Sequence, residues 1–319
     1  MDSKKSELVL KAAILYYEEM KTQNEIAKEL NISRSYVSQL LNHARKTGIV
    51  KISIQVDEFG LRMIKREIEF KRLFPSLQQV YIMRSDSEDF TANNLGKFAA
   101  PYITEFINNS KIIGINPGLS VERTIRHLKN QGIQVSKEHK VVPLMGGIDF
   151  NDNSPYAHPN EITKELGEVL NCEYFYLNCP AVIEQRNLRD QLIKERSISE
   201  VIKLWDNIDL AIMGLGVADE RSKLFKLFGE KSRRKIIKSG AVGVINISYF
   251  DENGNFIPLY EDHKIGITID KLKKIPKKVV ICSGKFKARA LIGALKGSFI
   301  NILITDSLTA DEVERYKLK

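Results

Sequence analysis

The pattern of apolar and polar residues changes near residue 57 of the chain. Before that point, apolar residues recur every three or four positions, which predicts short amphipathic helices. From Leu77 onward, continuous apolar runs alternate with helical patterns. Buried strands separated by helices favour a mostly parallel sheet with both faces covered. The sequence therefore predicts an α/β protein with a small helical domain at 1–56 and a larger domain at 57–319.

The larger domain is expected to contain short, buried strands. They are predicted at 78–83, 111–116, 140–145, 173–178, 209–214, 241–247, 264–269, 277–282 and 300–305. The segment "YFDENGNFI" at 249–257 is typical of a hairpin with Asn253-Gly254 at its turn. A helix over 61–73 is expected to join the two domains. Two roles for that helix are equally favoured: contact with a second subunit in a dimer, and packing on its own domain.

Two consecutive helices of the small domain have clear start signals. Thr22 followed by Glu25 is a capping-box pattern, so a helix is expected to begin at Gln23. Asn31 tolerates the left-handed backbone of a tight turn, and Ser33 is a good N-cap for a helix over 34–46. This succession is a helix-turn-helix signature. The alternation of "VKISIQV" at 50–56 predicts a strand that would give the motif a wing.

The outward face of the second helix is polar and basic, and no Asp or Glu occurs between Ser33 and Gly48. A helix of this kind can lie in the major groove of DNA and read base edges. A plain helical hairpin with a solvated face is the alternative. The residues predicted to bind DNA are Thr22, Gln23, Ser33, Arg34, Ser35, Tyr36, Ser38, Gln39, Asn42, Arg45 and Lys46.

Glycine follows several predicted strands at their carboxyl ends. The stretch "KIIGINPGLSVERTI" at 111–125 combines a strand, a glycine turn and a Ser at a helix start, which favours a bound anion. Ligands of open α/β sheets bind beyond such strand ends, although glycine also serves turns for conformational reasons alone. A phosphorylated sugar is the hypothesis that this pattern favours. Its predicted contacts are Gly118, Leu119, Ser120, Gly146, Gly147, Asn160, Gly214, Gly216, Asp219 and Lys287.

Composition sets limits on these hypotheses. The net charge of +9 and pI near 9.2 permit nucleic-acid binding. No apolar run approaches the ~18 residues that span a bilayer. The N-terminus lacks the continuous apolar region of a signal peptide, so a cytoplasmic location is expected. Cys172, Cys179 and Cys282 fit no zinc template, and neither a metal nor a cofactor is expected.

No combination of residues predicts catalysis. The five histidines have no obvious nucleophile partner in the sequence. Asp219, Glu220 and Asp306 follow predicted strands, and acid–base chemistry is open to them, but capping or ligand hydrogen bonding is favoured. The glycines of 214–219 lack the third glycine of a dinucleotide fingerprint.

The order of several segments resembles the SorC family of sugar-binding bacterial transcriptional regulators. The resemblance covers nearly the full length. After the helix-turn-helix it rests on "IGINPGLSVERTI", "VVPLMGG", "HPNEITKEL" leading to "YFYLNCPAVIE", "DLAIMGLG", "AVGVINISYFDENG", "CSGKFKARALIGAL" and "NILITDSLTA".

The resemblance implies a larger domain with the fold of sugar-phosphate isomerases and glucosamine-6-phosphate deaminase. It implies that Gly118 and Ser120 hold phosphate, that Lys287 lies near the ligand, and that the chain is a homo-oligomer, a dimer or tetramer. Two positions depart from the family pattern. Pro117 stands where many members have Trp or Gly, and Met145 stands where some have a Lys or Arg that engages the effector. The second departure excludes a Schiff base at that position and disfavours a bisphosphate.

The sequence thus predicts a DNA-binding transcriptional regulator, not an enzyme, whose operator binding is controlled by a sugar or sugar-phosphate effector. The alternative is a phosphosugar isomerase or deaminase with an accessory DNA-binding domain. A third reading is a regulator with a protein partner, in which the glycines at the strand ends are only structural.

Overall fold

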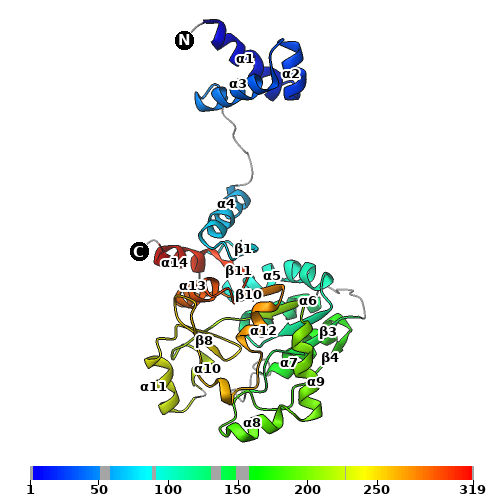
Figure 1. Cartoon of the computed structure of the whole chain (residues 1–319), viewed down its shortest axis with the longest axis vertical. Coiled ribbons are helices and arrows are strands. Elements are labelled where there is room, and N and C mark those ends of the chain that lie inside the picture. The colour runs from blue at the N-terminus through cyan, green and yellow to red at the C-terminus, as the bar shows by residue number, and fades with distance from the viewer. Residues whose placement is uncertain are drawn as a thin grey trace. The chain divides into compact units, whose positions relative to one another are not determined.

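The computed structural model describes residues 3–50, 58–87, 91–130, 138–148, 158–226 and 228–317. The chain divides into two compact units, Met1–Glu58 and Phe59–Lys319, and Figure 1 follows it through both from the N- to the C-terminus. Each unit has a hydrophobic core of its own. Within the described residues, no helix is both long and apolar enough to cross a membrane.

The small unit contains three helices, α1 (Ser3–Tyr17), α2 (Gln23–Glu29) and α3 (Arg34–Lys46). Both predicted helix starts are confirmed. Thr22 and Glu25 form a reciprocal capping box, in which the Thr22 N–H donates to the Glu25 carboxylate over 2.8 Å. Ser33 Oγ accepts from the Tyr36 N–H at 3.2 Å, and Asn31 has a φ of 52° in the left-handed region. The buried core consists of Val9, Ala12, Ala13, Leu15, Ile26, Val37, Leu40, Leu41 and Ala44.

The chain after α3 is described as far as Val50. The Val50 N–H donates to the Ala44 carbonyl over 3.0 Å, which folds this residue back onto the helix. Residues 51–56 of the expected wing lie outside the described residues.

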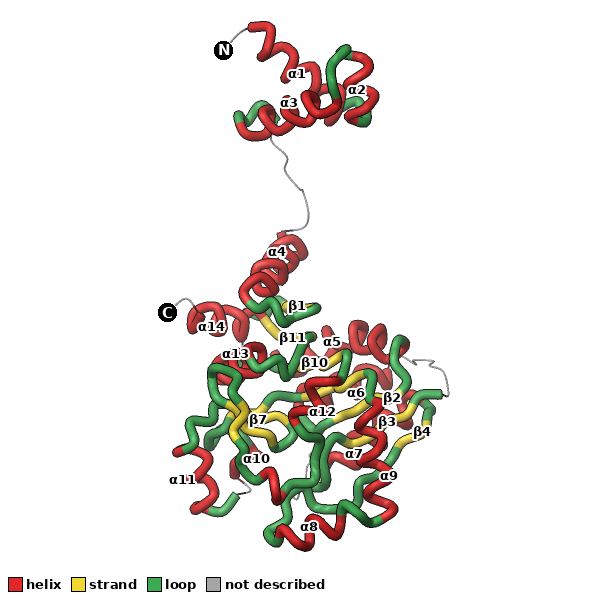
Figure 2. Tube along the Cα trace, viewed as in Figure 1, coloured by secondary structure: helices red, strands yellow, loops and turns green. Residues whose placement is uncertain are grey.

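A seven-stranded parallel sheet forms the centre of the larger unit (Figure 2). Its strand order is β1-β11-β10-β5-β2-β3-β4. The prediction of a mostly parallel sheet in an α/β fold is therefore confirmed. The strands are β1 (Gln79–Met83), β2 (Ile112–Ile115), β3 (Lys140–Pro143), β4 (Glu173–Tyr174), β5 (Leu210–Met213), β10 (Lys277–Ile281) and β11 (Ile302–Asp306).

Helices cover both faces of this sheet, because alternate residues of each strand point to opposite sides. On β5, Leu210 and Ile212 join one core cluster, whereas Ala211 and Met213 join the other. The first cluster includes α5 (Thr91–Asn108), α6 (Leu119–Asn130) and α7 (Pro159–Leu170). The second includes α4 (Glu58–Leu73), α9 (Arg196–Leu204), α12 (Ile269–Lys274), α13 (Ala288–Lys296) and α14 (Ser307–Lys317). The short helix α8 (Arg186–Leu192) has no buried residue.

A second, antiparallel sheet of four strands has the order β6-β7-β8-β9. Its strands are β6 (Gly216–Val217), β7 (Gly243–Ile245), β8 (Ser248–Phe250) and β9 (Phe256–Ile257). The predicted hairpin is confirmed, since Asp251 accepts from the N–H groups of Asn253 and Asn255 at its turn. The helices α10 (Lys223–Lys226) and α11 (Glu230–Lys238) lie between β6 and β7 in the chain.

Three strand predictions differ from the structure. Only Glu173–Tyr174 of the 173–178 run pairs in the sheet, and the 241–247 run contributes β7 to the antiparallel sheet. The strand expected at 264–269 is wrong. That segment makes isolated bridges at Lys264 and Gly266, and a helix begins at Ile269. A cap sets that helix start, since Thr268 Oγ1 accepts from the Lys271 N–H at 3.3 Å.

Candidate functional site

The outward face of α3 carries most of the residues predicted to bind DNA, and Thr22 and Gln23 lie at the start of α2. Arg34, Ser35, Gln39, Asn42, Arg45 and Lys46 are exposed, as are Thr22 and Ser33, and Gln23, Tyr36 and Ser38 are half-buried. The side chain of Arg45 donates to Asn42 Oδ1 over 2.5 Å, which orders two of these residues against each other. The face presents hydrogen-bonding and cationic groups along one side of a single helix.

Arg34, at the start of α3, lies beside the start of α2. A hollow of about 460 Å³ is lined by Tyr16, Tyr17, Met20, Lys21, Thr22, Gln23, Asn24 and Arg34. The structure thus brings Thr22 and Gln23 together with Arg34, as a shared DNA surface requires.

The four strand ends predicted to hold the anion belong to adjacent strands, β10, β5, β2 and β3. From β2 the chain continues outward through β3 and β4, then returns to β5 and proceeds the other way to β10 and β11. The boundary between β2 and β5 is therefore the topological switch point, where open α/β sheets bind their ligands.

Gly118 and Gly214 meet at this switch point. A Cβ added to Gly118 would lie 3.4 Å from the Gly214 Cα. Asn116 ties the same loops together, because its Oδ1 accepts from the Gly214 N–H at 2.8 Å and its Nδ2 donates to Asn246 Oδ1 at 2.9 Å. The ends of β2 and β5 are thus held to the loop between β7 and β8.

Ser120 lies in the first turn of α6, directly after this junction. Its side chain is buried, and within the described chain its Oγ has no hydrogen-bond partner. The exposed Leu119 is the first residue of the helix, and the Glu122 N–H donates to the Gly118 carbonyl over 2.9 Å. An unused hydroxyl at the N-terminus of a twelve-residue helix is suited to an anion.

Lys287 ends the short turn that follows β10. Burial lowers the pKa of its ammonium, and the nearby Asp306 carboxylate opposes part of that shift. Asp306 itself is buried and accepts from both the N–H and the Oγ1 of Thr309, at 2.9 and 2.6 Å. Asp306 therefore holds the start of α14, and Lys287 is left as a half-buried cation with no hydrogen bond in the described chain.

The Gly146-Gly147 pair after β3 packs against another segment. The Gly147 N–H donates to the Cys179 carbonyl over 2.7 Å, and a Cβ on Gly146 would lie 2.6 Å from that same oxygen. Asn160 fixes the neighbouring residues, since its Oδ1 accepts from the Leu177 N–H at 2.9 Å and its Nδ2 donates to Asn178 Oδ1 at 3.1 Å.

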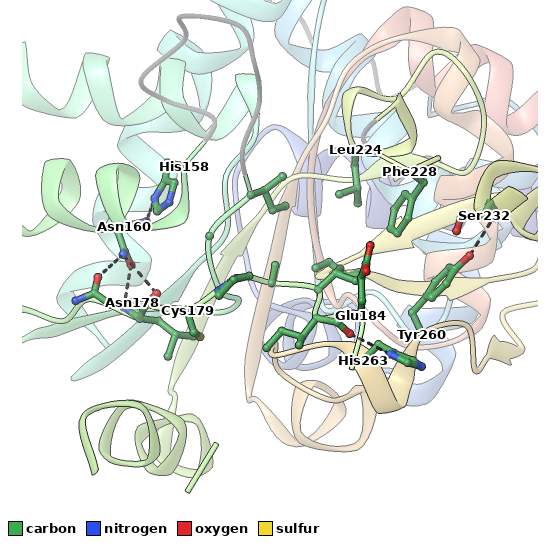
Figure 3. A pocket seen from close by; sticks show the side chains of 18 of the residues that line it. His158, Asn160, Asn178, Cys179, Glu184, Leu224, Phe228, Ser232, Tyr260 and His263 are labelled. Carbon is green, nitrogen blue, oxygen red and sulfur yellow. Dashed lines mark hydrogen bonds between the residues drawn. The ribbon is translucent and has the colours of Figure 1, made fainter. Parts of the chain in front are cut away.

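A cavity of about 830 Å³ lies beside these residues (Figure 3). This volume falls in the range of small-molecule sites. The lining residues are Gly147, Ile148, His158, Asn160, Leu177, Asn178, Cys179, Pro180, Ala181, Val182, Ile183, Glu184, Leu224, Phe228, Gly229, Ser232, Ile247, Tyr260 and His263. Of the residues predicted to bind the effector, Gly147 and Asn160 line this cavity and the others do not.

Two of the predicted effector contacts have local structural partners. Gly216 lies in β6, where a Cβ would come within 2.8 Å of the Val244 side chain. The Asp219 carboxylate accepts from the backbone N–H and the Nε of Arg221, at 3.0 and 2.9 Å. These hydrogen bonds lower the pKa of Asp219.

Sequence reasoning missed several residues of this region. Asn116 joins three strand ends through its hydrogen bonds. Its position in the sequence, directly after a strand, is shared by many residues without such a role. His158 could have been found from the sequence, because Pro159 is typical of the first position of a helix. In the structure, the His158 ring accepts from the Asn160 N–H and so caps that helix. Glu184 ends the quoted segment "YFYLNCPAVIE", but nothing in that segment marks it as a site residue, and Phe228 and Tyr260 lie in segments with no motif. Only the fold brings the three to one cavity.

Comparison with known proteins agrees with this two-unit architecture. Residues 14–47 match the family model "Sigma-70, region 4", and residues 61–313 match the family model "Putative sugar-binding domain". The first match spans the helix-turn-helix, and the second spans nearly all of the larger unit.

Full-length relatives combine the same two parts. The chain is 27% identical to the deoxyribonucleoside regulator of Bacillus subtilis over 97% of its own length and 98% of that protein. It is 27% identical to the sorbitol operon regulator of Klebsiella pneumoniae, covering 95% of this chain and 96% of that protein. The crystal structure of full-length SorC from Klebsiella pneumoniae superposes with a TM-score of 0.76 over 97% of this chain and 99% of that one. With the sugar-binding family matched over most of its length, the chain belongs to the SorC family of sugar-binding transcriptional regulators.

Proposed function

We propose that this regulator binds operator DNA through α3 and senses a phosphorylated sugar at the carboxyl ends of β2, β5 and β10. The contact of Gly118 with Gly214 at the switch point carries the proposal, together with the unused Ser120 hydroxyl beside it. Small residues let the ligand approach the backbone, and the α6 N-terminus supplies N–H groups to a phosphate. Lys287 supplies a positive charge from β10.

The DNA surface is proposed to be the predicted set of residues from Thr22 to Lys46. Arg34 lies at the N-terminal turn of α3, the part of a recognition helix that contacts base edges. The absence of Asp and Glu from α3 removes repulsion by DNA phosphates. Because its target is operator DNA, the regulator is proposed to act in the cytoplasm. The family resemblance supports the further proposal that it is a homo-oligomer.

The proposed control is a population shift. The effector must bind the DNA-competent and DNA-incompetent states with different affinities, since equal affinity would shift nothing. One relative is named a deoxyribonucleoside regulator and another a sorbitol operon regulator, which supports a carbohydrate effector for this chain as well.

The proposal includes no catalytic step. The Asp306 carboxylate, at the end of β11, accepts a hydrogen bond from Thr309, and the Asp219 carboxylate accepts one from Arg221. These two carboxylates therefore serve local hydrogen bonds rather than standing free for proton transfer.

The test is a thermal-shift panel of ribose, glucose, fructose and sorbitol, each free and phosphorylated, followed by operator binding with each stabilising compound. A ligand that binds only the folded state raises the melting temperature. We expect stabilisation by a phosphorylated member, a change in operator affinity, and no turnover. Conversion of a phosphosugar at a measurable rate would instead favour the isomerase or deaminase alternative.

A further inference from the structure

The lining of the 830 Å³ cavity is acidic, although the cavity lies beside the proposed phosphate site. Among the described residues that line it there is no Lys or Arg, and Glu184 is the one carboxylate. Glu184 is exposed, and within the described chain it has neither an ion pair nor a hydrogen bond. In Figure 3 its side chain extends in the direction of Phe228. The cavity therefore disfavours a second anionic group.

The two histidines of the cavity offer complementary hydrogen-bonding groups. His263 Nδ1 lies 3.0 Å from the Ile183 carbonyl, which only accepts, so this nitrogen carries a proton and Nε2 of the neutral ring is an acceptor. His158 Nδ1 accepts from the Asn160 N–H at 3.2 Å, so Nε2 of its neutral ring is the donor. These assignments follow from the hydrogen-bond partners. A ligand with hydroxyl groups can use both.

One wall of the cavity is aromatic. The rings of Phe228 and Tyr260 stack with centroids 5.2 Å apart and an interplanar angle of 20°. Tyr260 is fixed further, because its hydroxyl donates to the Ser232 carbonyl at 3.4 Å. Such a wall suits the apolar C–H face of a sugar better than a phosphate, whose transfer from water would need compensating charge.

The cavity adjoins the strand ends that are proposed to hold phosphate. Asn246 accepts from Asn116 at the switch point, and the next residue, Ile247, lines the cavity. On the other side, Gly147 both follows β3 and lines the cavity. The segments at Ile247 and Gly147 therefore connect the two places, and along them a single ligand is proposed to extend.

We propose that this cavity takes the uncharged, hydroxyl-bearing end of the effector, and that Glu184 makes the site selective for sugar monophosphates over bisphosphates. The inference rests on the proposed phosphate site at Ser120 and Lys287. Glu184 acts as a specificity-determining residue, because among the described residues that line the cavity a second phosphate would meet the Glu184 carboxylate and no Lys or Arg side chain. The buried Met145 before the glycine pair supplies no compensating charge.

The experiment measures binding of matched pairs by calorimetry: fructose 6-phosphate with fructose 1,6-bisphosphate, glucose 6-phosphate with glucose 1,6-bisphosphate, and inorganic phosphate alone. The variants are Glu184→Gln, Glu184→Lys and the control Glu195→Lys, which makes the same charge change at an exposed residue outside the cavity. We expect the wild type to prefer a monophosphate by about tenfold, equivalent to ~1.4 kcal/mol. Glu184→Lys should abolish or reverse that preference, Glu184→Gln should reduce it, and Glu195→Lys should keep it.

Other outcomes decide between this inference and the proposed function. Equal wild-type affinity for both members of a pair, or an unchanged preference in Glu184→Lys, would overturn the role of Glu184. Binding of inorganic phosphate without binding of any monophosphate would overturn the assignment of the cavity to the sugar. If neither phosphate nor any sugar phosphate binds, the proposed phosphate site itself is wrong, and this inference falls with it.

Discussion

The two units of this regulator encode their surfaces in different ways. The proposed DNA surface lies within 25 residues of sequence, Thr22 to Lys46, on two helices whose starts are set by capping hydrogen bonds between residues three positions apart. The proposed effector site draws on strand ends from Gly118 to Lys287, which only the strand order brings side by side. The first surface therefore depends on local interactions and the second on the tertiary fold.

This difference has a consequence for mutation. A change in the small unit is expected to alter DNA binding without altering effector binding, and a change at the strand ends is expected to do the reverse. The five predictions below test that separation, beginning with the largest expected effect.

Leu40→Ala should cause the largest effect, a loss of stability of the small unit. Leu40 is buried in the three-helix core, and removing such a side chain costs about 2–5 kcal/mol of stability. The measurement is thermal unfolding followed by circular dichroism, with and without a stabilising sugar phosphate. Ligand stabilisation of the larger unit should survive. The matched variant Leu291→Ala, in buried α13, should weaken the larger unit instead, and loss of ligand stabilisation in Leu40→Ala would show that the units are not separable.

Lys287→Met should weaken binding of inorganic phosphate or a sugar phosphate by about tenfold to a hundredfold, since a hydrogen bond to a charged group contributes ~1.5–3 kcal/mol. Calorimetry of the intact protein measures this. Lys274→Met, at an exposed lysine of α12, is the control and should bind as the wild type does. Equal affinities for the two variants would remove Lys287 from the site.

Arg34→Ala should weaken operator binding by about 1–3 kcal/mol and leave effector binding unchanged. Fluorescence anisotropy with an operator selected from random DNA gives the affinity at fixed salt. The exposed Lys11→Ala, on α1 and paired with Glu7, is the charge-matched control. If both variants lose affinity equally, Arg34 contributes only general charge.

Phosphate binding should weaken as pH rises toward the alkaline range. Burial lowers the pKa of Lys287 from 10.5, so its charged form disappears at a lower pH than for an exposed lysine. The anion prefers the ammonium, and affinity should fall by at most about tenfold per pH unit above that lowered pKa. Calorimetry from pH 8 upward checks this, because phosphate is already a dianion there. A fall of the same size in Lys287→Met would assign the effect to another group.

Thr22→Ala should have the smallest effect, about 1 kcal/mol on the small unit, because it removes the N-cap of α2. The melting temperature of that unit measures it. Thr47→Ala, an exposed threonine after α3 that donates to the His43 carbonyl, is a comparison outside a capping box. A larger loss in Thr47→Ala than in Thr22→Ala would contradict the weight given to the cap.

The sequence predicted the small unit well because its signals are short-range. The cap at Ser33 and the left-handed Asn31 set the start of α3 at Arg34, where the structure has it. The parallel sheet was also predictable, since buried apolar runs identify strands. The sequence could not show which strand ends lie together, because that depends on the strand order. This order places the switch point between β2 and β5.

The errors have two origins. The run at 264–269 is apolar enough for a strand, but the Thr268 cap starts a helix there. The cavity was not predictable, because His158, Glu184 and Tyr260 stand far apart in sequence and only the tertiary fold brings them together. Whether the remaining predicted residues contact an effector stays a prediction.

The most direct test of the account is operator binding by the wild type and by Ser120→Ala, with and without the sugar phosphate that stabilises the wild type. The account predicts that the ligand changes wild-type operator affinity by at least about fivefold, the lower end of allosteric coupling. Ser120→Ala should bind the operator as tightly as the wild type without ligand and lose most of the response. A full response in Ser120→Ala, or no response of the wild type to any sugar phosphate, would contradict the account.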